Sequence, residues 1–308
     1  TKDEYDIIME MVNLKNRTVD ENEKYTIDDA LSELFIEESE LKEIISTLKY
    51  KKNIVLQGAP GVGKTFIAKR IAYLIMGEKD ESRVQMIQFH QSYSYEDFIQ
   101  GYRPTDNGGF DIKYGIFYEF CKKAQSNPDK EYFFIIDEIN RGNLSKIFGE
   151  LMMLIEKDKR GEEFAIPLTY SKNDQEKFYL PKNLYFIGTM NTADRSLAMV
   201  DYALRRRFGF ITLEPAFGKE KFISFLRDNK VPEALITDIN KKMLELNKLI
   251  EDDDKNLGAG YRIGHSYFCP EVGTKADNEW LKYVLKNEIK PLLEEYWFDD
   301  KIKSGEQI

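Results

Sequence analysis

A glycine-rich segment in the first quarter of the chain has the residues needed to hold phosphate groups. It matches the pattern G-x-x-x-x-G-K-[ST] and consists of Gly58, Ala59, Pro60, Gly61, Val62, Gly63, Lys64 and Thr65. In this pattern the glycines let backbone N–H groups turn toward phosphate oxygens, and the following helix adds the partial positive charge of its first turn. The lysine reaches the β- and γ-phosphates, and the hydroxyl binds Mg²⁺. We therefore predict a nucleotide site made by residues 58–66, which include Phe66, with Thr65 as one Mg²⁺ ligand.

Two adjacent carboxylates form the second half of this predicted site. Asp137 and Glu138 follow the continuous apolar run of residues 133–136, which is typical of a buried strand in a parallel sheet. Ligands bind at the carboxyl ends of such strands. We expect Asp137 to hold Mg²⁺, directly or through water, and Glu138 to orient and polarise the attacking water. An isolated pair of this kind is often only a strand end, but together with the phosphate-binding loop it predicts nucleotide hydrolysis.

A third group of polar residues follows the strand predicted at residues 184–188. Asn191 is our first choice for a side chain that contacts the γ-phosphate and the attacking water, and Thr192 is the second. The alternative is an Asx turn that caps the next helix, an interpretation that fits Asp194 best. Further along, Arg205, Arg206 and Arg207 crowd the end of a predicted helix.

Three adjacent cations are unfavourable unless something binds them. An arginine that reaches the γ-phosphate of a neighbouring subunit would explain the run, because such an arginine stabilises the charge of the transition state. The alternative is pairing with the helix dipole and with local carboxylates.

The pattern of apolar residues predicts the elements that position these groups. Strands are expected at residues 54–56, 86–89, 132–136, 184–188 and 208–213, and helices between them at 65–76, 117–124, 146–157 and 198–206. An earlier helix is expected to begin after Ser39 as its N-cap. Strands that alternate with helices indicate a three-layer α/β/α unit with a parallel sheet. Two small hairpins are expected near residues 108–115 and 164–180.

Residues after Pro215 contain no further strand pattern. Helices are expected at 220–255 and 277–298. The chain therefore divides into an N-terminal extension (1–25), an α/β nucleotide-binding domain (26–215) and a small helical domain (216–308).

Composition excludes several classes of protein. The chain has 308 residues, 42% of them hydrophobic, which is enough for a core and argues against disorder. Its net charge of −9 excludes a general nucleic-acid-binding surface, so any DNA contact must be local. Two cysteines and two histidines, all far apart, argue against a disulfide scaffold or a zinc centre. No apolar run reaches the roughly 18 residues of a membrane span, and no signal-peptide pattern is present, so we expect a cytoplasmic protein with no membrane contact.

Several segments together resemble one family. They are residues 89–98, 101–104, 137–143, 190–196 and 261–268, and the string Met-Asn-Thr-Ala-Asp-Arg-Ser at 190–196 is the narrowest of them. Over roughly residues 26–270 the chain resembles the AAA+ GTPase motors of the McrB type, from McrBC modification-dependent restriction systems. The resemblance implies an AAA+ P-loop NTPase core followed by a helical lid.

The resemblance also implies activity and partners. Motors of this type hydrolyse GTP rather than ATP with Mg²⁺, assemble as hexameric rings, and recruit an McrC-like subunit that stimulates hydrolysis and carries the nuclease. They recognise methylated DNA through a separate N-terminal domain, which we expect to be absent here because about 25 residues precede the motor. Because the sequence begins with Thr1 rather than Met, we expect it to be part of a longer chain.

Individual residues take roles from the same resemblance. Asn191 matches the first-sensor position, and Asp194 and Arg195 match the rest of the hallmark string, which is implicated in turnover and its stimulation by the partner. Arg141 extends the metal motif toward the γ-phosphate or the adjacent subunit. Arg206 and Arg207 are the favoured arginines in trans. The lid is expected to close near Arg262 and His265, although packing is the commoner role for His265 and for His90.

Two other functions remain open on sequence grounds. One is an ATP-driven chaperone of the MoxR-like group, which remodels a protein partner. The other is a nucleotide-dependent scaffold that does not hydrolyse, which Glu138 disfavours. The chain has no N-K-x-D motif for reading guanine, so the GTP preference rests on the resemblance, and residues 26–30 are the expected place for base contacts.

Overall fold

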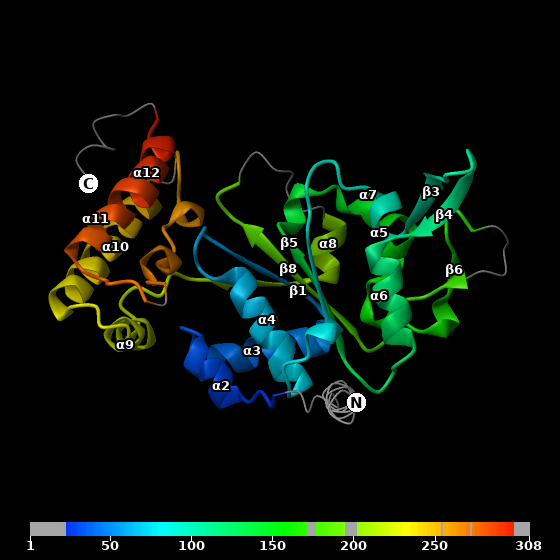
Figure 1. Cartoon of the computed structure of the whole chain (residues 1–308), viewed down its shortest axis with the longest axis horizontal. Coiled ribbons are helices and arrows are strands. Elements are labelled where there is room, and N and C mark those ends of the chain that lie inside the picture. The colour runs from blue at the N-terminus through cyan, green and yellow to red at the C-terminus, as the bar shows by residue number, and fades with distance from the viewer. Residues whose placement is uncertain (1–22, 172–176, 195–201, 254, 272, 299–308) are drawn as a thin grey trace, which may run out of the picture.

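The computed structural model describes residues 23–171, 177–194, 202–253, 255–271 and 273–298. At its centre is a five-stranded parallel sheet (Figure 1). The strands are β1 (Asn53–Gly58), β2 (Val84–Gln88), β5 (Tyr132–Asp137), β8 (Leu184–Asn191) and β9 (Gly209–Leu213), in the order β2-β5-β8-β1-β9. Because the carboxyl ends of β5, β8 and β1 are neighbours, the acidic pair, the polar strand end and the phosphate-binding loop lie side by side. The predicted parallel α/β sheet is confirmed.

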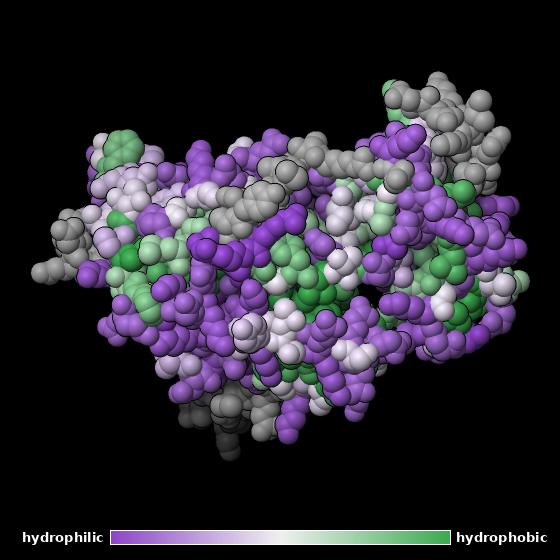
Figure 2. All heavy atoms as spheres, turned by 180° about the vertical axis from the view of Figure 1, so that it is seen from behind, coloured by the Kyte–Doolittle hydropathy of each residue, from purple (hydrophilic) through white to green (hydrophobic). Residues whose placement is uncertain are grey.

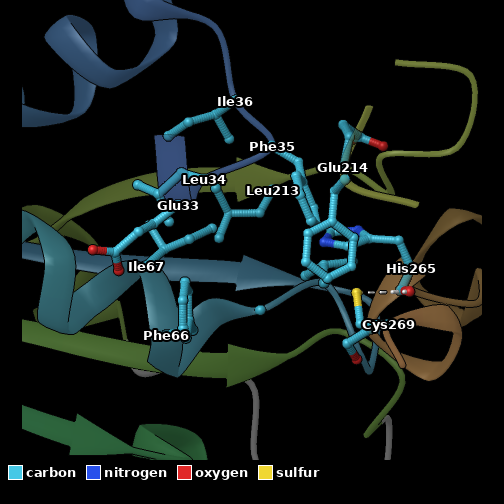
Figure 3. A pocket seen from close by; sticks show the side chains of 14 residues that line it. Glu33, Leu34, Phe35, Ile36, Phe66, Ile67, Leu213, Glu214, His265 and Cys269 are labelled. Atoms are coloured by element: carbon cyan, nitrogen blue, oxygen red, sulfur yellow. Dashed lines mark hydrogen bonds between the residues drawn. The ribbon is translucent and has the colours of Figure 1, made fainter. Parts of the chain in front are cut away.

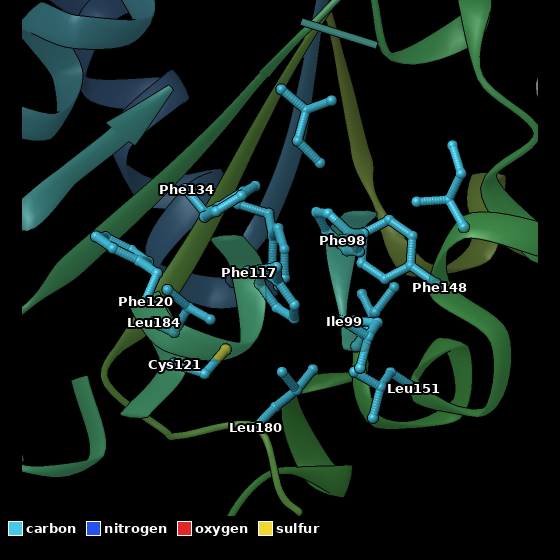
Figure 4. Packing of buried hydrophobic residues seen from close by; sticks show 14 of the residues in the cluster. Phe98, Ile99, Phe117, Phe120, Cys121, Phe134, Phe148, Leu151, Leu180 and Leu184 are labelled. Atoms are coloured by element: carbon cyan, nitrogen blue, oxygen red, sulfur yellow. The ribbon is translucent and has the colours of Figure 1, made fainter. Parts of the chain in front are cut away.

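Helices cover both faces of this sheet. Side chains alternate between the faces along each strand, so Phe133 and Ile135 pack with one helical layer while Phe134 and Ile136 pack with the other. The first layer contains α2 (Ile27–Glu33), α3 (Glu38–Lys51) and α4 (Lys64–Met76); the second contains α5 (Tyr95–Phe98), α6 (Ile116–Gln125) and α7 (Leu144–Phe148). Figure 4 shows the aromatic packing of the second layer, where the Phe98 and Phe117 rings stack at 4.6 Å. The three-layer prediction is confirmed.

Shorter elements complete the α/β part. The two expected hairpins are present as β3 (Gln100–Pro104) with β4 (Phe110–Tyr114), and as β6 (Ile166–Pro167) with β7 (Lys177–Phe178). Short 3₁₀ turns occupy η1 (Glu81–Arg83), η2 (Ile139–Arg141), η3 (Gly149–Leu154), η4 (Lys157–Lys159) and η5 (Glu162–Phe164).

Some predicted boundaries are wrong. The helix expected at residues 146–157 ends at Phe148, because Gly149 has a φ of 51° and the chain continues as 3₁₀ turns. Ser39 is not an N-cap, since α3 begins at Glu38 and Glu37 caps it. The helix expected at 198–206 is observed as α8 (Tyr202–Arg207); residues 195–201 and 1–22 lie outside the described parts.

The C-terminal helices have a core of their own. They are α9 (Glu220–Asp228), α10 (Glu233–Asp252), α11 (Asn278–Val284) and α12 (Lys290–Tyr296), with the short turns η6 (Ala259–Tyr261) and η7 (His265–Phe268) and a π-helical turn at Leu285–Ile289. Within the range 220–255, where the sequence predicted helices, α9 and α10 are separated by a short break, and Pro232 is the N-cap residue of α10. These helices form the separate unit at the left of Figure 1.

One residue of the α/β part is built into that C-terminal core. Phe35, between α2 and α3, places its ring 5.4 Å from Phe222 and 5.1 Å from Phe225. No helix within the described ranges is long and apolar enough to cross a membrane. Figure 2 shows hydrophilic side chains over most of the rear face, with apolar side chains in smaller patches.

Candidate active site

The phosphate-binding loop joins the end of β1 to the start of α4. Gly61 and Gly63 have φ values of 77° and 78°, a region that disfavours side chains with a Cβ, and Gly63 is the N-cap of α4. The Lys64 ammonium donates to the carbonyls of Gly58 (3.1 Å) and Ala59 (2.8 Å). Burial lowers the Lys64 pKa to about 8, although the carboxylates of Glu138, Asp137 and Asp194 oppose the shift. Lys64 is therefore a buried cation held by neutral carbonyls.

The predicted metal ligands are in direct contact. The Thr65 hydroxyl donates to Asp137 Oδ1 at 2.8 Å, and the hydroxyl of Thr189, on β8, donates to the same oxygen at 2.5 Å. Carboxylate and hydroxyl oxygens are the hard ligands that Mg²⁺ prefers, so this pair fits the ion. The sequence analysis did not single out Thr189, because it chose Asn191 and Thr192 from the polar residues after the strand predicted at 184–188; the observed β8 extends to Asn191 and includes Thr189.

Glu138 adopts an unusual backbone conformation beside this pair. Its φ of 51° and ψ of 48° are left-handed values that cost a non-glycine residue about 1–3 kcal/mol, and such strained residues cluster at active sites. Asn191 Nδ2 donates to Glu138 Oε1, and Arg141 Nε lies 3.3 Å from Oε2. Burial raises the Glu138 pKa, while the Arg141 guanidinium opposes the shift. The structure thus brings Glu138 and Asn191 together, as the sequence predicted.

Arg141 links the Glu138 carboxylate to Asp194, which belongs to the segment 190–196. Its Nη2 donates to Asp194 Oδ2 at 3.0 Å, so Asp194 forms an ion pair rather than only a helix cap. Asn140, the preceding residue, is 8% exposed. Arg195 lies outside the described residues.

A lid segment lies directly on the phosphate-binding loop. The Gly264 N–H donates to the Pro60 carbonyl (3.0 Å), and the Ser266 N–H donates to the Gly61 carbonyl (2.9 Å). A Cβ on Gly264 would lie 2.0 Å from the Gly61 carbonyl carbon, so only glycine fits there. Thr192 also serves the lid, because its hydroxyl donates to the Gly260 carbonyl at 3.0 Å.

The surroundings of His265 and His90 bear on whether each histidine has a packing role or a functional role. His265 is buried, its Nδ1 accepts from the Ala216 N–H (3.0 Å), and its ring contacts Phe35 and Phe222. Burial lowers the His265 pKa to about 4. These contacts support the packing role. His90 makes a ring contact with Tyr93 beyond the end of β2.

A pocket of about 310 Å³ opens beside the loop (Figure 3). Its walls are mostly apolar, and the acidic residues Glu33 and Glu214 at its margin pair with Arg70 and Arg262. The lining comes from five parts of the chain: Glu33, Leu34, Phe35 and Ile36; Val62, Gly63, Phe66 and Ile67; Leu213 and Glu214; Phe225; and His265, Ser266 and Cys269. Thr26 and Asp29 form a capping box on α2 and are not among the lining residues, and the expectation of base contacts at residues 26–30 stays a prediction.

The arginine run lies at the amino ends of the strands, whereas the phosphate-binding loop lies at their carboxyl ends. α8 ends just before β9, whose first residue, Gly209, pairs with Ile54 at the start of β1. A strand of this length separates the run from the phosphate-binding loop by roughly 17 Å. Glu156 pairs with Arg206 (3.1 Å) and Arg207 (3.2 Å), so the local salt bridges of the alternative interpretation are present. Neither arginine belongs to the site built by its own chain.

Similarity to known proteins agrees with this geometry. Residues 53–208 match the AAA domain family (dynein-related subfamily), and residues 238–305 match the family described as McrB, alpha-helical lid domain. The type IV methyl-directed restriction enzyme EcoKMcrB subunit of Escherichia coli (strain K12) is 59% identical over 284 residues, covering 91% of this chain and 61% of the relative. The type II restriction enzyme BsuMI component YdiS of Bacillus subtilis (strain 168) is 28% identical over 198 residues, covering 53% of this chain and 57% of the relative. The chain therefore spans about three fifths of each relative's length.

Proposed function

The chain belongs to the AAA+ family of nucleoside triphosphatases and has a lid domain of the McrB type, and from that premise we propose that it is a GTP-preferring motor that drives restriction of modified DNA. The observation that carries the proposal is the contact of Thr65 with Asp137 at 2.8 Å, directly beside Glu138 and Asn191. Members of the family depend on a nucleotide and on Mg²⁺ in general.

The site residues have complementary roles in this proposal. Lys64 would bind the β- and γ-phosphates through its ammonium group. Thr65 and Asp137 hold Mg²⁺, which supplies positive charge against the phosphate oxygens when bound. Glu138, with its raised pKa, accepts a hydrogen bond from the attacking water and aligns it, and Asn191 fixes the carboxylate.

Arg141 and Asp194 extend the same group of side chains to the surface. Arg141 is 42% exposed and pairs with both Glu138 and Asp194. We propose that this ion-paired group, continued by Arg195, transmits the effect of a partner on turnover. A displacement of Asp194 would change the charge around Glu138 through Arg141.

The apolar pocket is the proposed position of the base. Phe66 and the segment 33–36 offer apolar surface to a planar ring, and Glu33 and Glu214 offer acceptors. Guanine carries an amino donor at N2 that adenine lacks, so a hydrogen-bond acceptor next to that amino group would favour GTP over ATP. Arg70 pairs with Glu33 at 2.7 Å and so fixes the direction of that carboxylate.

Partners follow from the relatives. The Escherichia coli relative is a subunit of a methyl-directed restriction enzyme, and we propose that this chain acts likewise, in a ring of six copies with an McrC-like subunit that stimulates hydrolysis and carries the nuclease. We propose that DNA is read mainly by a domain separate from the one described. The net charge of −9 supports that division, because it disfavours extensive phosphate contacts.

The decisive experiment measures turnover of GTP and ATP, with and without the McrC-like subunit. The proposal expects GTP turnover that the partner increases, and Glu138→Gln should abolish it while nucleotide binding and assembly persist. Turnover of ATP but not GTP would refute the GTP motor and favour a MoxR-like chaperone. GTP turnover by Glu138→Gln at the unmodified rate would refute the role of Glu138.

A further inference from the structure

The arginine-bearing end of α8 is held by one carboxylate oxygen. Glu156 Oε1 lies 3.1 Å from Arg206 Nη2 and 3.2 Å from Arg207 Nε. Two guanidinium groups on adjacent residues repel each other, and a shared carboxylate between them reduces that repulsion. Glu156 therefore fixes the relative directions of both side chains.

The two arginines differ in what they can reach. The Arg207 side chain is 12% exposed, and its carbonyl accepts from Asn53 Nδ2 at 3.0 Å. The Arg206 side chain is 73% exposed, and its carbonyl accepts from Lys51 Nζ at 3.3 Å. Arg207 thus anchors the end of the helix to the sheet, while Arg206 is free to meet another molecule beyond its contact with Glu156.

The backbone before Glu156 is itself fixed to the sheet. Arg160 is 1% exposed and donates to the Ile155 carbonyl through Nε (3.1 Å) and Nη2 (3.0 Å). It also donates to Asn53 Oδ1 (2.5 Å) and to the Leu184 carbonyl. Because Asn53 binds both Arg160 and the Arg207 carbonyl, the segment that carries Glu156 and the end of α8 share one buried support at the start of β1.

The surrounding surface has features of a protein contact. Tyr50 is 72% exposed and its ring centroid lies 5.4 Å from Lys157 Nζ, on the residue after Glu156. Aromatic and arginine side chains are enriched in protein interfaces. The surface next to Arg206 therefore combines an exposed aromatic ring with positive charge, which suits a neighbouring copy whose nucleotide presents negative charge.

We propose that Glu156 is a positioning residue that holds Arg206 in the direction needed to reach the nucleotide of the neighbouring subunit, with Arg207 as the anchor. The inference rests on the proposed ring and adds to it which arginine acts in trans and what orients that arginine. Glu156 touches no substrate. Its effect must therefore fall on the neighbour's turnover and leave its own chain's nucleotide affinity unchanged.

Mixed assemblies test whether Glu156 acts on the nucleotide site of the neighbouring subunit rather than on the site of its own chain. The acceptor subunit carries Arg206→Ala, which keeps its own nucleotide site but supplies no arginine. The donor carries Lys64→Ala, which supplies Arg206 but has an impaired site. Arg206→Ala alone should lose about 10³–10⁵-fold in GTP turnover, and the donor should partly restore it. A donor with Lys64→Ala and Glu156→Gln should restore about 10–10²-fold less, because misplacement by about 1 Å has such a cost.

Matched donors separate charge from general damage. Glu163 pairs with Lys182 at 2.7 Å and not with α8, so a Lys64→Ala, Glu163→Gln donor should restore as well as Lys64→Ala alone. A Lys64→Ala, Glu156→Asp donor, which keeps the charge on a shorter side chain, should restore to an intermediate level. The acceptor KM for GTP should be the same with every donor. Assembly of each mixture is checked by size-exclusion chromatography.

The outcomes separate this inference from the proposed function. Equal restoration by the Glu156→Gln and Lys64→Ala donors would overturn the positioning role while leaving the ring motor intact, and so would an Asp donor no better than the Gln donor. Full turnover by Arg206→Ala alone, or no restoration by any donor, would instead overturn the action of Arg206 in trans. A changed acceptor KM would show that Glu156 acts by another route.

Discussion

The protonation of Lys64 gives a quantitative prediction. Its pKa is lowered to about 8, chiefly by burial, from the ordinary 10.5. Phosphate oxygens need the charged ammonium, so nucleotide binds the protonated form. Raising the pH through 8 should therefore weaken nucleotide binding, whereas lowering it from 8 to 7 should have little effect.

The size of the effect follows from the titration curve. With a pKa of about 8, roughly 90% of Lys64 is charged at pH 7 and about 9% at pH 9. Each pH unit above 8 should thus reduce nucleotide affinity about tenfold, or by about 1.4 kcal/mol in binding free energy. A lysine with the ordinary pKa would show almost no loss up to pH 9.5.

Equilibrium binding of a fluorescent GTP analogue from pH 7 to pH 10 measures this slope. Lys64→Arg is the control, because a guanidinium stays charged over the whole range and any titration of the nucleotide is common to both proteins. For each protein, the affinity at every pH is divided by the affinity of the same protein at pH 7. Parallel curves for the two proteins would refute the reasoning, because they would show that Lys64 does not titrate in this range.

Three other substitutions have definite expected outcomes. Glu138→Gln should reduce GTP turnover by at least about 10²-fold with nucleotide affinity retained, as measured by single-turnover hydrolysis and binding; equal rates would exclude a role in water activation. Arg160→Met should lower the free energy of unfolding by about 3 kcal/mol or more in urea titrations, since it leaves several buried carbonyl oxygens unpaired; a loss below about 1 kcal/mol would contradict the buried support. Gly264→Ala should weaken nucleotide binding while the far-UV circular dichroism stays unchanged, because the methyl group collides with Gly61; unaltered affinity would mean that the lid contact is dispensable.

The sequence was informative where chemistry and local structure coincide. The phosphate-binding loop and the Asp137–Glu138 pair are contiguous, and each adjoins a strand whose apolar run is unambiguous. Parallel pairing then requires their carboxyl ends to meet. The contacts of Thr65 with Asp137 and of Asn191 with Glu138 follow from that requirement.

Features assembled from distant segments were not predictable in this way. The pocket is lined by five separate stretches of the chain, and most of its lining residues are ordinary apolar types without a recognisable spacing. Glu156 has no pattern that links it to the arginine run, since only the sheet brings them together. The early end of α7 depends on the left-handed backbone of Gly149, and a single glycine in a helical pattern does not reveal its φ.

The contact between lid and phosphate-binding loop is made by main-chain atoms, through the Pro60 and Gly61 carbonyls and the N–H groups of Gly264 and Ser266. Substituting a side chain leaves a backbone hydrogen bond in place, so this contact does not depend on the side chains of Pro60 and Ser266. The contact is sensitive to substitution at Gly61 and Gly264, where a Cβ atom would collide with the facing segment. A saturation-mutagenesis survey of residues 264–266 should therefore find Gly264 far less tolerant of substitution than Ser266, whose contribution to the contact is its backbone N–H.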